Sequence, residues 1–256
     1  MVLAIDIGNT HTVIGIFEEG AFRGHWRFFS DHTRTADECA LLLHQISLWS
    51  GVALEEITGI VMASVVPPLT PVFEEMVQRY LNQKPILVSS DLEVSVAIGC
   101  AEPKRVGADR IANAVGAFEK FGGPTIVVDL GTATTFDVIT RDGVYLGGAI
   151  APGVETSATM LFHKTAQLPR VELAKPETVI GRTTEDSLQA GIFYGTVGQI
   201  DEIVRRIEME LEEKATVVAT GGLAELVSQE ARTIEVVEPY LTLEGLYCIF
   251  KRLQGR

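Results

Sequence analysis

The sequence predicts an α/β protein built from two similar halves, and three observations lead to this prediction. Apolar, β-branched runs of strand length alternate with longer stretches of helical spacing, an order typical of sheets covered by helices. A strand-like run followed by Asp-x-Gly occurs twice, at Asp6 and at Asp129. The strands and helices that follow each copy come in the same order. We therefore expect two domains, residues 1–121 and residues 122–256.

The central copy of the repeat has the composition of a phosphate-binding loop. Asp129 lies at the end of an apolar run, Gly131 follows it, and the hydroxyls of Thr132, Thr134 and Thr135 come next. The glycine allows a tight turn and close approach of a ligand to the backbone. A carboxylate at such a hairpin tip can hold a magnesium ion or its waters, while N–H groups and hydroxyls face the phosphate oxygens.

The N-terminal copy can be aligned with the central one without a gap. The alignment superimposes four pairs: Asp6 on Asp129, Gly8 on Gly131, Thr12 on Thr135, and Gly20 on Gly143, where each hairpin is expected to turn. One such hairpin is typical of a plain β-turn, since Asp and Gly are ordinary turn residues. Two copies, one opening each half, indicate a duplicated binding loop.

Composition limits the class of protein. The hydrophobic fraction of 46% supports two well-filled cores, and the net charge of -13 argues against nucleic acid or an anionic membrane as partner. We expect no signal peptide, because no charged segment followed by an apolar one opens the chain, and no run long enough to span a bilayer. Cys39, Cys100 and Cys248 lie far apart without metal-ligand spacing, as in a reduced, cytoplasmic protein.

The remaining elements follow the same order in each half. In the first half we expect a strand at 25–30, a helix beginning near 35, a strand at 59–66, a helix at 70–80, a strand at 85–88 and a helix at 111–121. In the second half we expect a hairpin at 126–148, a long helix at 184–213, a strand at 216–220, a helix at 223–230, a strand at 233–237 and a helix at 243–253. The long helix carries an apolar stripe, which is either core or the contact surface of a dimer.

A third motif follows the strand of the second half that ends at Thr220. Gly221 and Gly222 come next and precede a helix. Such glycines let a base and ribose lie against the backbone, and the helix N-terminus adds N–H donors, although a Gly-Gly pair is also common in purely structural loops. The chain has neither of the two commonest glycine-rich nucleotide motifs.

Together these motifs resemble the two phosphate motifs and the adenosine motif of the actin–hexokinase–heat-shock ATPase superfamily. That resemblance implies two duplicated actin-like (ribonuclease H-like) domains with a nucleotide cleft between them. Within the superfamily the chain resembles type III pantothenate kinases, and the match runs in family order along essentially the whole chain. The blocks that carry it are Gly8-Asn9-Thr10, Ala63-Ser64-Val65-Val66-Pro67, Gly107-Ala108-Asp109-Arg110, the stretch from Asp129 to Thr135, and Gly147 to Gly153.

The resemblance implies an activity and its partners. The activity is ATP-dependent phosphorylation of pantothenate to 4′-phosphopantothenate, the first step of coenzyme A biosynthesis. The cofactors are ATP with Mg²⁺ and a monovalent cation, K⁺ or NH₄⁺. The partners are pantothenate and ATP, with no nucleic acid and no membrane, and the protein is a cytoplasmic homodimer.

The resemblance also implies residue roles. Asp109 is the general base; Asp129 binds the monovalent cation, and Asp6 faces Mg-ATP as a second metal residue. ATP is bound by Asp6, Gly8, Asn9, Thr10, Thr132, Gly221 and Gly222. Pantothenate is bound by Cys100, Gly107, Ala108, Asp109, Arg110 and Thr184. Asp109 and Thr184 could instead be helix N-caps, and Arg110 could hold the γ-phosphate, the pantothenate carboxylate, or only a surface salt bridge.

One residue departs from the family pattern, and two other functions stay open. Cys100 stands where many members have a tyrosine that lines the pantothenate pocket, so the pocket wall is altered. Another small-molecule kinase of the same fold is one alternative, although a repressor-related sugar kinase usually has a Cys-rich zinc motif. The other alternative is a regulatory protein without turnover. Such a protein could lose carboxylates freely, whereas Asp6, Asp109 and Asp129 are all present.

Overall fold

The computed structural model describes residues 1–165 and 168–255, which form two compact units. The first unit comprises Met1–Glu119 together with the C-terminal segment from Leu241 onward, and the second comprises Lys120–Tyr240. This division differs from the expected one at the C-terminus. Helix α7 (Leu241–Leu253) belongs to the first unit because it packs on that unit's central strands, β1 and β4.

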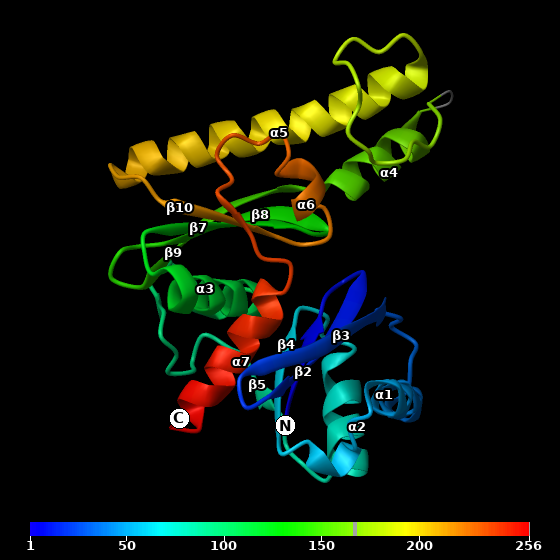
Figure 1. Cartoon of the computed structure of the whole chain (residues 1–256), viewed down its shortest axis with the longest axis vertical. Coiled ribbons are helices and arrows are strands. Elements are labelled where there is room, and N and C mark those ends of the chain that lie inside the picture. Colours follow the sequence, from blue (N-terminus) through cyan, green and yellow to red (C-terminus); the bar gives the residue numbers. More distant parts are fainter. Residues whose placement is uncertain (166–167, 256) are drawn as a thin grey trace. The chain divides into compact units, whose positions relative to one another are not determined.

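The first unit contains a mixed five-stranded sheet in the order β3-β2-β1-β4-β5 (Figure 1). Its strands are β1 (Val2–Ile7), β2 (His11–Glu18), β3 (Ala21–Phe29), β4 (Gly59–Ser64) and β5 (Ile86–Leu87). The first three pair antiparallel, and β4 and β5 add in parallel on the other side of β1. The predicted hairpin, third strand and crossover strands are therefore confirmed.

The two faces of this sheet are covered by different helices. Leu3, Ile5 and Ile7 join a core with helices α1 (Ala36–Ser50) and α2 (Thr70–Leu81). On the opposite face α7 lies so close that Gly15 and Gly59 leave no room for a Cβ beside Leu243 and Phe250. The remaining elements of the unit are η1 (Leu54–Glu56), β6 (Ala97–Ile98), η2 (Pro103–Arg105) and α3 (Ala108–Phe121).

The second unit repeats this topology. Five of its strands run in the order β11-β10-β7-β8-β9, with the β7-β8-β9 meander antiparallel and β10 and β11 parallel to β7. Their bounds are β7 (Thr125–Leu130), β8 (Ala133–Ile139), β9 (Val144–Pro152), β10 (Thr216–Thr220) and β11 (Val236–Val237). The internal duplication predicted from the sequence is thus confirmed.

The long predicted helix is α5 (Thr184–Leu211), which lies along one face of this second sheet (Figure 1). The stripe residues Val197, Ile200 and Val204 are buried in one cluster with the sheet. These three residues of the stripe are therefore core, and a dimer contact through the rest of the helix stays a prediction. Helices α4 (Val154–Lys164) and α6 (Ala224–Val227) complete the unit. Within the described part of the chain, no helix combines the length and hydrophobicity that crossing a membrane requires.

The register of the two hairpins corrects the gap-free alignment. Asp6 pairs with Val13 and Asp129 pairs with Thr135, so Thr12 corresponds to Thr134 rather than to Thr135. The reason is loop length: three residues separate β1 from β2, and two separate β7 from β8. The offset is restored in the third strand, and both hairpins have a bulge at the same place, after Ile16 and after Val138.

Candidate functional site

The first predicted phosphate loop joins β1 to β2. Asp6 is half-buried at the end of β1, and the Gly8 N–H donates a hydrogen bond of 3.1 Å to the His11 carbonyl. Asn9 and Thr10 are exposed at the tip. The loop therefore presents a carboxylate and polar tip residues, the arrangement expected for the phosphates of a nucleotide.

The candidate base lies in the first turn of α3. Because α3 begins at Ala108, Asp109 is the second helical residue, and the alternative of an N-cap is wrong. Its Oδ1 accepts a hydrogen bond of 2.7 Å from the Arg110 N–H. Burial raises the pKa of the Asp109 carboxyl, opposed by that hydrogen bond and by the Arg110 charge. A Cβ at Gly107 would overlap with Asp109 Oδ1, so this glycine makes room for the carboxylate.

Within the first unit, the phosphate loop and the base are close neighbours. The Val65 N–H donates 3.1 Å to the carbonyl of Ile7, the last residue before the loop. The Val65 side chain in turn lies 3.4 Å from the place a Cβ would occupy at Gly107. The block after β4 therefore connects the Asp6 loop to the Asp109 turn.

A hollow of about 640 Å³ opens beside this turn. Gly107 and Ala108 line it together with Ser64 and Val65, so two blocks that carry the family resemblance meet in one cavity. Pro67, from the same block as Ser64 and Val65, also lines it. The other lining residues, which the sequence did not single out, are mostly hydroxyls and charged groups: Thr70, Val88, Ser89, Ser90, Asp91, Lys104, Arg105 and Val106. Hydroxyls and cations at this density suit a small polar anion.

The second phosphate loop joins β7 to β8 and is shorter. The Gly131 N–H donates 3.0 Å to the Ala133 carbonyl, and Thr132 is exposed at the tip. Gly221, at φ +90°, packs beside the loop: a Cβ there would lie 2.7 Å from Asp129 Oδ1 and 2.7 Å from the Leu130 carbonyl oxygen. The predicted adenosine motif and second phosphate motif are therefore in contact.

The end of the Gly147–Gly153 block packs against the same loop. Gly153 approaches the carbonyl oxygens of Gly131 and Thr132 so closely that a Cβ would overlap both. Thr156, in the first turn of α4, donates from its hydroxyl to the Thr132 carbonyl at 2.7 Å. These contacts fix the main chain at the loop tip and explain why a glycine is required at 153.

The three hydroxyls after Asp129 do not share one surface, contrary to our expectation. Thr134 is fully buried, on the face that Leu130 and Phe136 turn toward α5. Thr135 points to the opposite face, as alternation along a strand requires. Sequence spacing alone contained this signal, because adjacent strand residues cannot face the same ligand.

Thr135 belongs to a polar network that the sequence analysis missed. Its hydroxyl donates to Asp137 Oδ2 at 3.2 Å, and the Tyr145 hydroxyl donates to Asp137 Oδ1 at 2.7 Å. Asp137 and Tyr145 are fully buried. The alternation of Thr135 and Asp137 along β8 places both on the face of Asp129, the cross-strand partner of Thr135.

The chemistry around Asp129 fits a cation that prefers oxygen ligands. The Asp129 carboxylate, the Leu130 carbonyl and the Thr135 hydroxyl are hard oxygen donors of the kind that bind Mg²⁺ or K⁺. Among the described residues, no group of three or more His, Cys, Asp and Glu side chains could hold a metal. A transition-metal centre of that kind is thus not indicated there.

Two predicted pantothenate residues come from other elements. Cys100 is half-buried in the loop after β6. Thr184 is exposed as the first residue of α5, while the N-cap is Thr183, whose hydroxyl and Asp186 form a capping box. The alternative role of Thr184 as the cap is therefore wrong. Its role toward a substrate stays a prediction.

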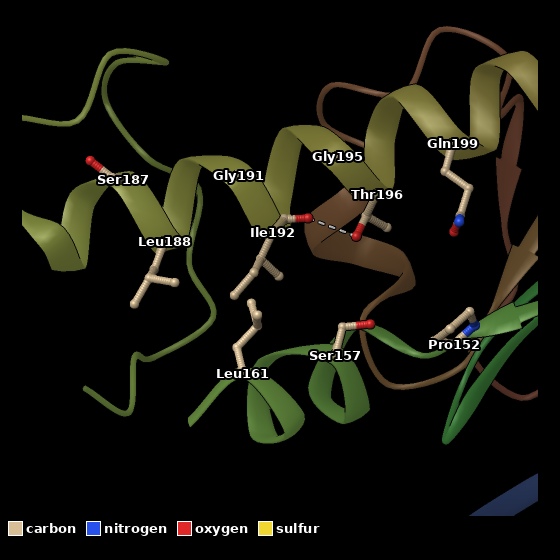
Figure 2. Close-up of a pocket in the computed structure, with 10 residues that line it drawn as sticks. All are labelled: Pro152, Ser157, Leu161, Ser187, Leu188, Gly191, Ile192, Gly195, Thr196 and Gln199. Carbon is tan, nitrogen blue, oxygen red and sulfur yellow. Dashed lines mark hydrogen bonds between the residues drawn. The ribbon is translucent and has the colours of Figure 1, made fainter. Parts of the chain in front are cut away.

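A second hollow of about 350 Å³ lies between α4 and α5 (Figure 2). Leu161 of α4 and Ile192 of α5 point toward one another, and the Thr196 hydroxyl is turned back to the Ile192 carbonyl at 2.8 Å. Gly191 and Gly195 lie on the same helix, and a Cβ at either would meet none of the described atoms within 4 Å. This side of α5 therefore has space beside it.

Comparison with known proteins places the chain in a family. The family model described as type III pantothenate kinase matches residues 2–206. A type III pantothenate kinase from Moorella thermoacetica is 49% identical over 252 residues, which cover 98% of this chain and 99% of the relative.

Two solved structures of low identity share the fold. A putative Baf family transcriptional activator from Campylobacter jejuni has a TM-score of 0.60 at 18% identity, covering 99% of this chain and 100% of that one. Component A of the Acidaminococcus fermentans (R)-2-hydroxyglutaryl-CoA dehydratase has a TM-score of 0.60 at 12% identity, covering 100% and 99%. These likenesses confirm the predicted two-domain, actin-like α/β fold, and the family match shows that the chain belongs to the type III pantothenate kinases.

Proposed function

We infer that Asp109 is the general base of the family's reaction, the ATP-dependent phosphorylation of pantothenate to 4′-phosphopantothenate in coenzyme A biosynthesis. The observation that carries this inference is the position of its carboxylate. Its Oδ1 lies against Gly107, which lines a polar hollow, and burial raises the pKa of the carboxyl. A raised pKa brings a carboxylate closer to the range in which it can accept a proton during attack.

The hollow beside Asp109 is the proposed pantothenate site. Gly107 and Ala108 contribute its edge, and Lys104 adds a positive charge to its wall. Arg110 is the proposed partner of the transferred phosphoryl group or of the substrate carboxylate, since guanidinium groups bind both in two-pronged fashion. Cys100 and Thr184 are the remaining proposed substrate contacts.

ATP is proposed to bind through the two phosphate loops and the Gly221-Gly222 turn. Asp6 holds Mg²⁺ or its waters, and Gly8, Asn9, Thr10 and Thr132 face the phosphates. Phosphoryl transfer needs mainly positioning and charge neutralisation, which loops of this kind provide. The contact between Gly221 and the Asp129 loop supports this arrangement within the second unit.

Asp129 is the proposed ligand of a monovalent cation, K⁺ or NH₄⁺. Its carboxylate lies beside the Leu130 carbonyl and the phosphate loop, so a cation there adds positive charge where phosphate charge must be neutralised. The residues present fit such an ion by their oxygen donors.

The protein is proposed to act as a cytoplasmic homodimer. Val197, Ile200 and Val204 of the α5 stripe are buried in core, so a second copy needs further surface. Large apolar side chains are exposed on α4 and before α5, namely Met160, Leu161, Phe162, Val179 and Ile180. Large exposed apolar side chains of this kind are candidates for a protein interface. Light scattering of the purified protein measures its mass directly, and a monomer at micromolar concentration would contradict the dimer.

The proposed function is tested by product analysis. Purified protein, Mg-ATP and pantothenate are incubated with potassium or ammonium, and 4′-phosphopantothenate is measured by mass spectrometry. We expect product that requires both substrates. A folded protein that forms none with either cation would overturn the assignment.

A further inference from the structure

We propose that Thr135, held in place by Asp137 and Tyr145, supplies a hydroxyl oxygen to the monovalent cation at Asp129. This proposal rests on the proposed function, because that function places the cation at Asp129. It adds a second side-chain ligand and the two residues that orient it.

The first step of the argument is placement. Asp129 and Thr135 are directly opposite each other on β7 and β8. Residues paired across antiparallel strands point to the same face, with Cβ atoms about 4.5–5.5 Å apart. Both side chains are half-buried and so keep some access from outside. A carboxylate and a hydroxyl in this relation can bind one ion between them.

The second step is the direction of the hydroxyl. A threonine hydroxyl has one proton and two lone pairs. The Thr135 proton is directed to Asp137 Oδ2 at 3.2 Å, so the atom that remains available is an oxygen acceptor. A hydroxyl whose proton is committed in this way presents its lone pairs, which can accept from a donor or bind a cation.

The third step is the anchor behind the hydroxyl. Asp137 is fully buried, and its other oxygen receives the Tyr145 hydroxyl at 2.7 Å. Burying a carboxylate costs folding free energy unless it is hydrogen-bonded, so a buried Asp137 indicates a role for this carboxylate. Orientation of a ligand by a hydrogen-bonded carboxylate is a common device in metal sites.

The first unit provides an internal comparison. By register, Val13, Gly15 and Phe22 occupy the positions of Thr135, Asp137 and Tyr145. The whole polar network is therefore present opposite Asp129 and replaced opposite Asp6, although the backbone repeats down to its bulge. The difference is expected if only Asp129 shares its ion with a threonine.

The test measures cation binding without turnover. The melting temperature is recorded while KCl replaces choline chloride at constant total salt, because an ion that binds only the folded state stabilises it by an amount set by the ion concentration relative to its dissociation constant. The dissociation constant fitted to this dependence is the potassium midpoint of each variant. The variants are Thr135→Val, Thr135→Ser and Tyr145→Phe. Thr134→Val is the matched control, since it makes the same change one residue away on the opposite face.

We expect Thr135→Val to raise the potassium midpoint at least about tenfold and Tyr145→Phe to raise it severalfold, as losses of ligands and their supports do. Thr135→Ser and Thr134→Val should keep the parent midpoint. If Thr135→Val has the same potassium midpoint as the parent protein, the proposal is overturned. Should that variant not fold, an unchanged midpoint in Tyr145→Phe would overturn it instead.

Failure of the proposal differs from failure of the proposed function. If the parent protein forms 4′-phosphopantothenate with potassium stimulation that Asp129→Ala removes, while the Thr135 variants bind potassium normally, only the inference falls. If the parent protein forms product at the same rate with and without the cation, the cation site and this inference are both wrong, while the kinase activity stands. A parent that forms no product removes the proposed function.

Discussion

The two Asp-x-Gly hairpins share their backbone but differ in what surrounds the carboxylate. Both have a terminal aspartate, a short loop, and a bulge at the same place in the next two strands. The residue paired with Asp6 on β2 is Val13, whereas the residue paired with Asp129 on β8 is Thr135. Main-chain hydrogen bonds thus preserve the scaffold, and the side chains on one strand face are free to specialise.

A similar divergence occurs where each third strand ends. The register places Ser30 and Gly153 at equivalent positions after β3 and β9. Ser30 bonds to Thr12 through the two hydroxyls at 2.9 Å, whereas Gly153 lies against the carbonyls of the second loop and has no side chain to offer. At this position the second hairpin therefore relies on backbone packing, where the first has a pair of hydroxyls.

The largest effect is expected from Asp109→Asn, which tests whether the chemistry belongs to the first unit. An amide cannot accept the hydroxyl proton, and loss of a general base costs about a hundredfold or more in turnover. Pantothenate binding should persist, as measured by calorimetry. A loose phosphoryl transition state depends less on a base, which sets the expected loss of turnover near the lower limit of about a hundredfold. Turnover within threefold of the parent would show that Asp109 is not the base.

The raised pKa of Asp109 predicts a pH dependence of stability. A carboxyl whose folded-state pKa is raised binds protons more readily in the folded state, so stability decreases as pH rises from its unfolded to its folded pKa. Asp109→Asn removes this cost. We expect the variant to melt at or above the parent temperature at neutral pH, with the difference shrinking as the solution is acidified toward pH ~4. A variant that melts well below the parent at pH 7 would contradict the dominance of burial.

Paired alanine variants of the two hairpin carboxylates separate their roles. Asp129→Ala should abolish the stimulation by potassium, because it removes the charged ligand of the cation. Asp6→Ala should lower the apparent affinity for Mg-ATP and leave the ratio of rates with and without potassium unchanged. Initial rates over a grid of both ligands measure the two effects together, with circular dichroism as the check on folding. Equal loss of stimulation in both variants would show that the hairpins are not specialised.

The fold could be predicted because its signals are local and repeated. Apolar runs end at Asp6 and Asp129, and the glycines at 20 and 143 adopt the positive φ that their turns require. The C-terminal helix was assigned to the wrong unit, since its apolar face is equally consistent with either sheet. The register error at Thr12 arose from a loop that differs by one residue, which no pattern of polar and apolar residues reveals.

The site was predicted unevenly for a similar reason. The carboxylates stand out because Asp at the end of an apolar strand is unusual, whereas the hollow beside Gly107 is lined by ordinary residues such as Ser89 and Ser90 from distant segments. Tyr145 lies eight residues from Asp137, and only the β8–β9 pairing brings them together. Tertiary pairing of this kind is not encoded in local spacing.

The smallest expected effect concerns the buried threonines at equivalent positions, Thr12 and Thr134. Both side chains are fully buried, and valine has nearly the same shape as threonine. Thr12→Val breaks a hydroxyl pair and leaves Ser30 without that partner, so it should destabilise by about 1 kcal/mol. The Thr134 hydroxyl has no hydrogen-bond partner among the described residues, so Thr134→Val should be neutral or stabilising by up to ~1 kcal/mol. Urea titrations of both variants against the parent measure the difference, and an equal loss in the two would mean that a bound water serves Thr134 as Ser30 serves Thr12.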